Sequence, residues 1–305
     1  MEKFDLGLAF VWEYDQDFID LTERLFHQNN LTTFIIGEHN IAEVRELIQS
    51  KKLHFNFYLD RAWDVNEEFG ALGLMINKRK TVIFNPYKQV LHAIDKATMH
   101  LEFISSGIHV PHSIIIPPVT EKEELYISLV DLAKLGRPFI IKPCNTTGGG
   151  TGVVTGAESL QEILHERNSH SEDKYIIQEK IYPMIPDGKR AWFRVFWAFG
   201  NAVPTWWDDQ THLYREMTQE EVRKFNLKEI FSITKTIAKL TQLDFFSTEI
   251  VLTQDGRFLA IDYVNDQCDM RLQSLHYDGV PDRVASQISY NMMKKVKQLK
   301  RKFKI

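Results

Sequence analysis

Short apolar runs alternate with amphipathic segments along the first 90 residues of the chain. Four runs, LGLAFVW, TTFIIG, HFNFYLD and TVIFN, have the length and the β-branched and aromatic content of buried strands. Between them lie segments such as IAEVRELIQS, whose apolar residues recur at the spacing of one helix face. Strands separated by helices predict parallel pairing through right-handed crossovers. These residues are therefore expected to form a small open α/β domain.

Beyond residue 90 the same patterns predict helices and hairpins in a less regular order. A helix over residues 89–106 should end at Gly107, because glycine commonly closes helices. The other expected helices cover residues 121–136, 159–168, 220–240 and 281–305. Strands are expected in the runs VPHSIIIPP, PFIIKP, GVVTG and YIIQEKI, and in two hairpins that turn near residues 200 and 255.

The 305-residue chain has an ordinary globular composition, with 44% hydrophobic and 26% charged residues. Its formal net charge of −4 and isoelectric point of about 6.3 give no electrostatic reason to expect nucleic acid or an anionic membrane as partner. Glu13 and Asp15 break the N-terminal apolar run, and no uncharged run approaches the ~18 residues of a membrane span. Cys144 and Cys268 cannot build a disulfide framework or a zinc site alone. We therefore expect a cytoplasmic protein that binds neither nucleic acid nor membrane.

The stretch IIKPCNTTGGGTGVV places Gly148, Gly149, Gly150, Thr151 and Gly152 between two expected strands. Glycines there let the backbone approach a ligand closely, and their N–H groups can form an anion cradle. Neither the P-loop nor the dinucleotide-binding pattern fits this spacing. An unliganded hairpin tip is the plain alternative. However, Lys142 ends the preceding apolar strand, and a charge there is costly without an anion. The loop and its lysine therefore predict a phosphate site.

The segment FFSTEIVLTQDGRFLAIDYVN contains two strand patterns around an Asp-Gly dipeptide, which is typical of two-residue type I′ hairpins. In that register Glu249 lies opposite Asp262, and like charges so placed are destabilising without a cation or a shared proton. Asn265, or Asp266 beside it, adds an oxygen ligand. Oxygen ligands without His or Cys suit Mg²⁺ bound with substrate phosphates. A different register, with the carboxylates splayed to solvent, is the alternative.

The order of these motifs resembles the ATP-grasp superfamily, nearest its ribosomal-protein glutamate ligase and glutathione synthetase-like branch, over residues 95–271. The Asp95-Lys96 step looks like the family's helix start, the glycine loop like its lid over the phosphates, and YIIQEKI like the hinge that reads adenine. By this resemblance the nucleotide contacts, besides the loop residues, are Lys96, Lys142, Gln178, Glu179, Lys180, Ile181 and Asp187. The metal ligands are Glu249, Asp262 and Asn265.

The chain also departs from the family pattern. The metal strand usually ends E-x-N, whereas Tyr263 and its neighbour separate Asp262 from Asn265 here, so a bulge or a shared role for the next aspartate is implied. Ser247 stands where peptide-forming relatives often have an arginine, and Trp192 replaces an acidic residue. The run DQCDMR replaces a proline-glycine turn. These differences concern the acceptor site rather than the nucleotide site.

The resemblance implies an ATP- and Mg²⁺-dependent carboxylate–amine ligase that releases ADP and phosphate. The γ-phosphate would pass to a substrate carboxylate, and an amine would attack the resulting acyl-phosphate. Arg194, in RAWFRVF, resembles the arginine of the branch, and Lys142 and Arg271 complete the expected catalytic set. Arg61 and Arg215 are further candidates for a substrate carboxylate. For each substrate arginine, a surface salt bridge is the structural alternative.

Two other functions stay open on this reading of the sequence. One is a kinase on the same scaffold, similar to inositol phosphate kinases, although few basic residues are available for a polyanion. The other is a regulatory protein that binds nucleotide without turnover. The predicted organisation is a Rossmann-like domain over residues 1–90, a nucleotide-lid subdomain over 91–181 and a metal-bearing subdomain over 182–305. The expected substrates are a small carboxylic acid and an amine, and relatives of this kind also form homodimers.

Overall fold

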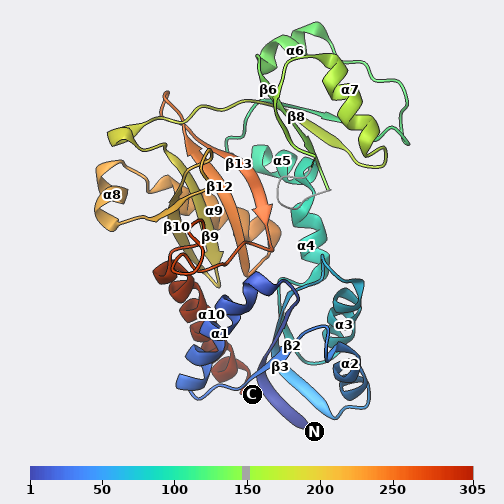
Figure 1. Ribbon diagram of the computed structural model, residues 1–305, viewed down its shortest axis with the longest axis vertical. Helices are drawn as coiled ribbons and strands as arrows, with labels where there is room; N and C mark the ends of the chain where they lie inside the picture. Colours follow the sequence, from blue (N-terminus) through green and yellow to red (C-terminus); the bar gives the residue numbers. More distant parts are fainter. Residues whose placement is uncertain (146–151, 305) are drawn as a thin grey trace. The chain divides into compact units, whose positions relative to one another are not determined.

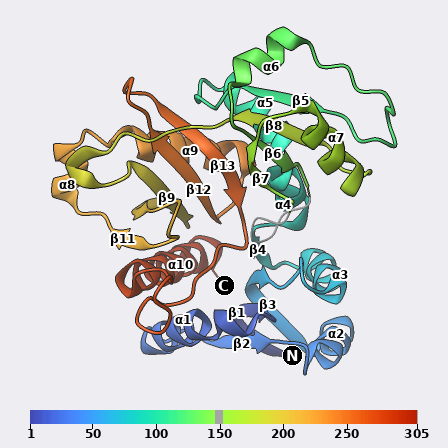
Figure 2. The same cartoon turned by 45° about the horizontal axis from the view of Figure 1, so that its top comes forward.

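The computed structural model describes residues 1–145 and 152–304, and Figures 1 and 2 show its elements from two directions. The predictions for Gly148, Gly149, Gly150 and Thr151 lie outside the described residues. The chain divides into two compact units. The first contains Met1–Val90, Arg194–Ser247 and Asn265–Ile305, and the second contains Leu91–Phe193 and Thr248–Val264. The predicted domain boundaries near residues 90 and 181 stay a prediction.

A four-stranded sheet with the order β2-β1-β3-β4 lies in the N-terminal part of the first unit. Its strands are β1 (Glu2–Phe10), β2 (Thr33–Ile36), β3 (Leu53–Arg61) and β4 (Val82–Phe84). The helices between them are η1 (Glu13–Asp15), α1 (Gln16–Gln28), α2 (Ile41–Gln49) and α3 (Glu67–Asn77). All of the strand pairs are parallel, which confirms the α/β arrangement predicted from the alternating pattern.

Helices cover both faces of this sheet. Helices α2 and α3 lie on one face, and α1 lies on the other beside the C-terminal helix α10 (Asp282–Phe303) (Figures 1 and 2). Buried apolar side chains, among them Val44, Phe55 and Leu72, fill the space under α2 and α3. On the other side, Thr22 Oγ1 of α1 lies 2.9 Å from Ser289 Oγ of α10. The apolar faces of the helices therefore pack against the sheet, as a layered domain requires.

The C-terminal helix α10 extends over 22 residues and confirms the predicted basic helix. Its buried face includes Ile288 and Met292, and its last turn carries Lys300, Arg301 and Lys302. In the part of the chain that the structure describes, no helix is both long enough and apolar enough to cross a membrane.

A second sheet has five strands in the order β11-β10-β9-β12-β13. Its strands are β9 (Trp192–Ala198), β10 (Asn201–Trp207), β11 (Tyr214–Glu216), β12 (Phe245–Leu252) and β13 (Phe258–Asn265). Helices α8 (Gln219–Lys224) and α9 (Glu229–Thr241) precede β12 in the sequence. All of β12 is buried. Strands β9, β12 and β13 contribute residues to both units.

The third sheet belongs to the second unit and has four strands in the order β5-β8-β6-β7. Its strands are β5 (Ser113–Ile116), β6 (Phe139–Pro143), β7 (Val154–Ala157) and β8 (Tyr175–Glu179), and its neighbours pair antiparallel. The helices of this stretch are α4 (Tyr87–Ile94), α5 (Lys96–Ser105), α6 (Leu129–Leu135) and α7 (Leu160–Ser169). Helices α6 and α7 cover the face that carries Ile141 and Ile177 (Figure 1). Because side chains alternate along a strand, Lys142 and Gln178 belong to the opposite face.

Three predicted helices are shorter or divided in the structure. The expected helix over 89–106 is two helices, because Asp95 is extended and its side chain caps α5. The expected helix over 121–136 forms only as α6, because Ser128 caps it from the middle of that segment. The expected helix over 220–240 is divided between α8 and α9. In the first two cases a polar side chain that satisfies free backbone N–H groups starts a new helix inside an apolar pattern.

The turn between β12 and β13 differs from the predicted two-residue turn. The N–H of Thr253 donates to Arg257 O at 2.9 Å, and that of Gly256 donates to Thr253 O at 3.0 Å. Thr253 and Arg257 therefore pair across residues 254–256, and Gly256 takes the left-handed φ of +82° that such a longer turn needs. The prediction that Glu249 lies directly opposite Asp262 assumed the two-residue turn. The longer turn shifts the pairing next to it by one residue, so it removes the basis of that prediction.

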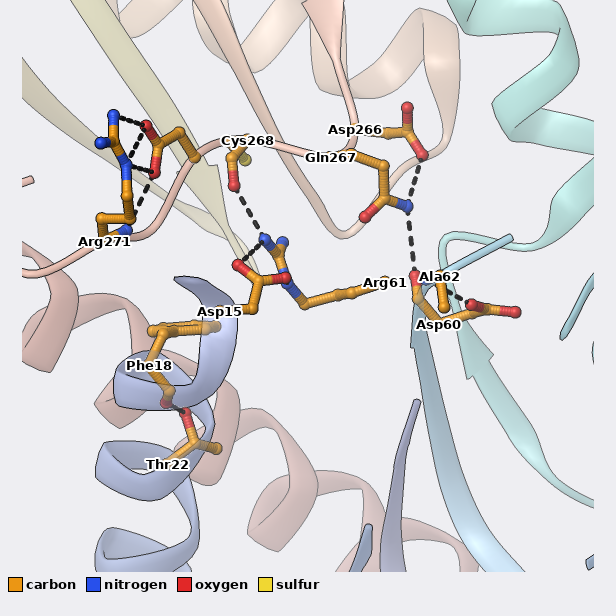
Figure 3. Close-up of polar contacts among 11 residues, drawn as sticks. Asp15, Phe18, Thr22, Asp60, Arg61, Ala62, Asp266, Gln267, Cys268 and Arg271 are labelled. Atoms are coloured by element: carbon orange, nitrogen blue, oxygen red, sulfur yellow. Dashed lines mark hydrogen bonds and ion pairs between the residues drawn. The ribbon is translucent and has the colours of Figure 1, made fainter. Parts of the chain in front are cut away.

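A buried ion pair connects the short helix η1 to the end of β3 in the first unit. Arg61 Nε and Nη2 donate to the Asp15 carboxylate at 2.8 and 2.7 Å, and Nη2 also donates to Cys268 O at 2.9 Å (Figure 3). Both charged side chains are only 2% exposed. Burial alone would lower the pKa of Arg61, but the Asp15 carboxylate raises it above its usual value. The pair ties the carboxyl edge of the sheet to the segment that follows β13.

Asp15→Asn should lower the free energy of unfolding by roughly 3–5 kcal/mol, because it leaves the buried Arg61 guanidinium without its counter-charge. Urea denaturation followed by circular dichroism measures the change. Lys134→Ala, which removes an exposed pair with Asp131, is the control and should cost less than about 1 kcal/mol. An equally small loss for Asp15→Asn would contradict a stabilising role of the buried pair.

Candidate active site

The second unit gathers two lysines and two carboxylates that the sequence predicts for phosphate and metal binding. Lys142 lies on β6, and its Nζ donates a 3.4 Å hydrogen bond to the backbone oxygen of Ile261 on β13. Burial lowers the pKa of Lys142, the carboxylates of Asp262 and Glu249 act in the opposite direction, and Lys96 adds to the lowering. The other three charged groups therefore lie within electrostatic range of Lys142.

The start of α5 brings Lys96 to this group. The backbone N–H of Lys96 donates to Cys144 O at 3.2 Å, which holds the helix start beside the residue that follows β6. Asp95 caps the helix, and its carboxylate also pairs with Lys174 Nζ at 2.5 Å. Burial would raise the pKa of Asp95, but hydrogen bonds from Lys174 and Thr98 bring it below its ordinary value. The helix start is thus fixed by its cap and by its neighbours.

The two carboxylates come from adjacent strands. Glu249 is 9% exposed on β12, and its Oε2 accepts a 2.9 Å hydrogen bond from Trp192 Nε1. Asp262 lies on β13, which ends at Asn265. Among the described residues, no group of three or more His, Cys, Asp or Glu side chains is arranged to hold a metal ion. Two carboxylates suit Mg²⁺ bound together with phosphates, since this ion takes one or two carboxylates rather than a complete protein cage.

Strand β8 leads into the residues predicted to contact adenine. Gln178 and Glu179 end the strand, and Lys180 and Ile181 follow it. The backbone N–H of Glu179 donates to His112 O at 2.9 Å, and its Oε1 accepts from the His112 N–H at 2.7 Å. Lys180 and Ile181 line a hollow of about 440 Å³ together with the turn between β12 and β13. That volume is in the range of small-molecule sites.

Comparison with solved structures identifies the fold. No family model and no curated protein matches the sequence. D-alanine–D-alanine ligase from Bacillus anthracis, complexed with ATP, aligns with a TM-score of 0.64 and 14% identity over 98% of this chain and 99% of that one. A RimK-domain ATP-grasp protein from Sphaerobacter thermophilus aligns with a TM-score of 0.62 and 16% identity over 94% and 98%. The ATP-grasp ligase PsnB, complexed with precursor peptide PsnA2 and AMPPNP, aligns with a TM-score of 0.62 and 13% identity over 97% of this chain and 99% of that one. The chain has the ATP-grasp fold.

The ATP-grasp fold confirms the resemblance drawn from the motif order, whereas the roles of single residues stay predictions. Arg194 belongs to the first unit and lies on β9. Its Nη1 donates to the Tyr214 hydroxyl at 2.9 Å, and its guanidinium carbon lies 4.1 Å from the centroid of the Trp207 ring. The arginine side chain is therefore oriented by aromatic neighbours.

Arg271 and Arg61, two candidates for a substrate carboxylate, are paired with carboxylates of the chain itself. Arg271 Nη2 lies 2.6 Å from Asp269 and 3.0 Å from Asp278. The hydrogen bonds to Asp269 are the main reason why its pKa is raised. Arg61 is held by the buried pair with Asp15. A substrate would have to compete with these partners.

Asp187 and Gly152 are described, although nothing tests their predicted contacts with nucleotide. Asp187 is exposed in the short helix η2 (Pro186–Gly188), with a φ of 50°. Gly152 has a φ of +72°, and a Cβ there would meet Pro143 Cγ at 3.3 Å. The conformation and this close approach favour glycine at position 152 whatever the loop binds.

Asp266, the alternative to Asn265 as a metal ligand, has partners within the first unit. Its Oδ2 accepts from Trp63 Nε1 at 2.9 Å. It also accepts from Gln267 Nε2 at 3.1 Å (Figure 3). Burial raises the pKa of Asp266 to about 6. Which of Asn265 and Asp266 serves as a third ligand stays a prediction.

Two residues at the site were not among those predicted from the sequence. Trp192 holds Glu249 by its indole N–H, and the hydroxyl of Tyr263 contacts His100 and Gln178. Each departs from the family pattern, Trp192 where the ATP-grasp branch has an acid and Tyr263 where E-x-N has a glutamate. The departures were visible in the sequence, but their partners could be recognised only from the fold.

Cys144 and Cys268 should be inert towards alkylation in the folded protein. Both are buried, and burial raises the pKa of each thiol to about 12, so the reactive thiolate is scarce at pH 8. Intact-mass measurement after iodoacetamide treatment should show no adduct under native conditions and two adducts after denaturation in urea. Rapid labelling of either thiol in the native protein would contradict this assignment.

Proposed function

We propose that the protein is an ATP- and Mg²⁺-dependent ligase that joins a carboxylate to an amine and releases ADP and phosphate. The observation that carries the proposal is the group formed by Lys96, Lys142, Glu249 and Asp262 in one unit of an ATP-grasp fold. Two cations beside two carboxylates suit a triphosphate that carries a divalent metal.

The similar structures support the reaction class. D-alanine–D-alanine ligase and PsnB are both ligases, and their structures contain ATP and AMPPNP respectively. ATP-dependent ligation is what these proteins share, so it is the part of the proposal that the comparison supports. The acyl-phosphate and the amide product are the finer part, and they rest on the resemblance of the motif order to the ATP-grasp ligases.

Lys142 and Lys96 would hold the phosphates. Burial makes the ammonium of Lys142 costly, which is why its pKa is lowered. An anionic phosphate nearby would favour the charged form of the lysine. Arg194 and the N–H groups of residues 148–152 would stabilise the charge that develops on the transferring phosphoryl group. Lys180 and its neighbours in the hinge would position the adenine.

Glu249, Asp262 and Asn265 would hold Mg²⁺. When bound, the ion would neutralise the β- and γ-phosphates and orient the γ-phosphoryl group for in-line transfer. The hydrogen bond from Trp192 fixes the orientation of the Glu249 carboxylate.

The substrate carboxylate would attack the γ-phosphorus, so that a C–O–P linkage forms and ADP leaves. The amine would then attack the acyl carbon, with loss of inorganic phosphate and of the amine proton. No nucleophilic side chain of the protein is needed. Arg271 would contribute to binding the substrate carboxylate in competition with Asp269 and Asp278.

Phosphorus NMR of the protein with Mg²⁺ and ATP tests the reaction class directly. Pools that contain both an acid and an amine, such as amino acids, small peptides and polyamines, should give ADP and inorganic phosphate. Pools that lack one partner should give little turnover. A new phosphate ester with phosphorylated polyols would instead identify a kinase. Nucleotide binding without turnover in any pool would favour the regulatory function.

Glu249→Gln and Asp262→Asn should each lower kcat by about two to three orders of magnitude, because each would weaken the binding of the Mg²⁺ that neutralises the transferring phosphoryl group. Steady-state ADP release measures the loss. Glu46→Gln, an exposed carboxylate on α2, is the matched control and should leave kcat unchanged. Full activity in either site variant would remove the basis for the metal assignment.

A further inference from the structure

Tyr263 is a buried phenol on β13, next to the predicted ligand Asp262. It is 3% exposed, and its hydroxyl lies 2.5 Å from His100 Nδ1. Gln178 Nε2 donates to the same hydroxyl at 3.2 Å and to Ser113 Oγ at 3.2 Å. His100 and Gln178 are also buried, at 5% and 2% exposure. The hydroxyl is therefore the centre of an internal polar network.

Each partner of Tyr263 lies on an element that carries predicted nucleotide contacts. His100 is one helical turn after Lys96 on α5. Gln178 lies near the end of β8, directly before the adenine hinge. Tyr263 itself follows Asp262 on the metal strand. All of these residues belong to the second unit, so one hydroxyl connects the helix, the hinge strand and the metal strand.

The network is neutral and closely packed. The ring of Tyr263 meets Phe103 edge-on, with 5.0 Å between centroids. Burial raises the pKa of Tyr263 and lowers that of His100 to about 4, so both groups are uncharged near neutral pH. Gln178 donates to the phenol oxygen, and the phenol and Nδ1 of the imidazole share one hydrogen bond whose donor depends on the tautomer of His100. Leaving one of these buried polar groups unpaired would cost more free energy than its hydrogen bond contributes. The network therefore restrains the positions of the three side chains.

We propose that Tyr263 is a positioning residue whose hydroxyl sets the spacing of Lys96, the adenine hinge and Asp262, and thereby the affinity for the Mg²⁺ nucleotide. The inference rests on the proposed function, because it concerns the same nucleotide site. Tyr263 stands two residues before Asn265, where the E-x-N pattern has a glutamate. In this chain the residue at that position is Tyr263, whose hydroxyl bonds to His100 and Gln178. The residue before it, Asp262, supplies the carboxylate.

Tyr263→Phe removes the hydroxyl and keeps the ring. It should raise the Kd for AMPPNP with Mg²⁺ about tenfold in isothermal titration calorimetry, the size expected from losing a buried hydrogen bond that aligns the site. The KM for ATP should rise with the Kd, while kcat changes by less than about threefold, because the contacts of the reacting atoms are retained.

Tyr175→Phe is the matched control. Tyr175 is also buried in the second unit, and its hydroxyl lies 3.1 Å from His170 Nδ1. Both variants should lower the Tm by similar amounts, but only Tyr263→Phe should weaken nucleotide binding. His100→Leu should reproduce Tyr263→Phe. His100→Asn, which keeps a polar atom near the position of Nδ1, should restore most of the affinity.

Equal AMPPNP affinity in the wild type and Tyr263→Phe would overturn the inference, as would an equal loss in Tyr175→Phe. A wild-type protein that binds no nucleotide would overturn the proposed function and this inference together, so the two failures are distinguishable. If Tyr263→Phe does not fold, the comparison of His100→Asn with His100→Leu decides, and equal affinity of these two variants would overturn the inference.

Discussion

The charge of Lys142 is the constraint on which the candidate site depends. Burial is the main influence on the pKa of Lys142 and lowers it. The carboxylates of Glu249 and Asp262 compensate in part, and the carbonyl of Ile261 accepts one of its protons. The paired strands that carry these oxygens must therefore stay close to β6. This requirement explains why so many of the surrounding contacts, such as the Trp192 hydrogen bond, restrain β12 and β13.

Much of this architecture could be predicted because it depends on local periodicity. The alternation of strand and helix patterns predicts the parallel sheet. The order of the motifs along the sequence predicts the ATP-grasp fold. The errors have a common cause, which is that apolar periodicity continues through residues whose side chains start a new helix, such as Asp95 and Ser128. The hairpin shows another limit. An Asp-Gly dipeptide fits both a two-residue and a longer turn, and hydrogen bonds from Thr253 and Gly256 select the longer one.

The arginines show what sequence reasoning could not reach. Arg61 and Arg271 have the chemistry to bind a substrate carboxylate, but their partners are carboxylates of the same chain. Asp15 is 46 residues from Arg61, and no spacing rule connects them. The first unit therefore uses arginine charge to fix the segment after β13. Breaking such a pair would leave a charge without its partner, so these arginines are structural residues unless a ligand replaces the aspartates.

Neither unit is continuous in the sequence. The chain passes from one to the other after Val90, Phe193, Ser247 and Val264. A cut after Phe193 or Ser247 would leave incomplete parts of both units in each fragment, and it would break β9 or β12. Each unit therefore depends on segments that are far apart in the sequence. A fragment that ends at residue 193 would contain neither unit complete.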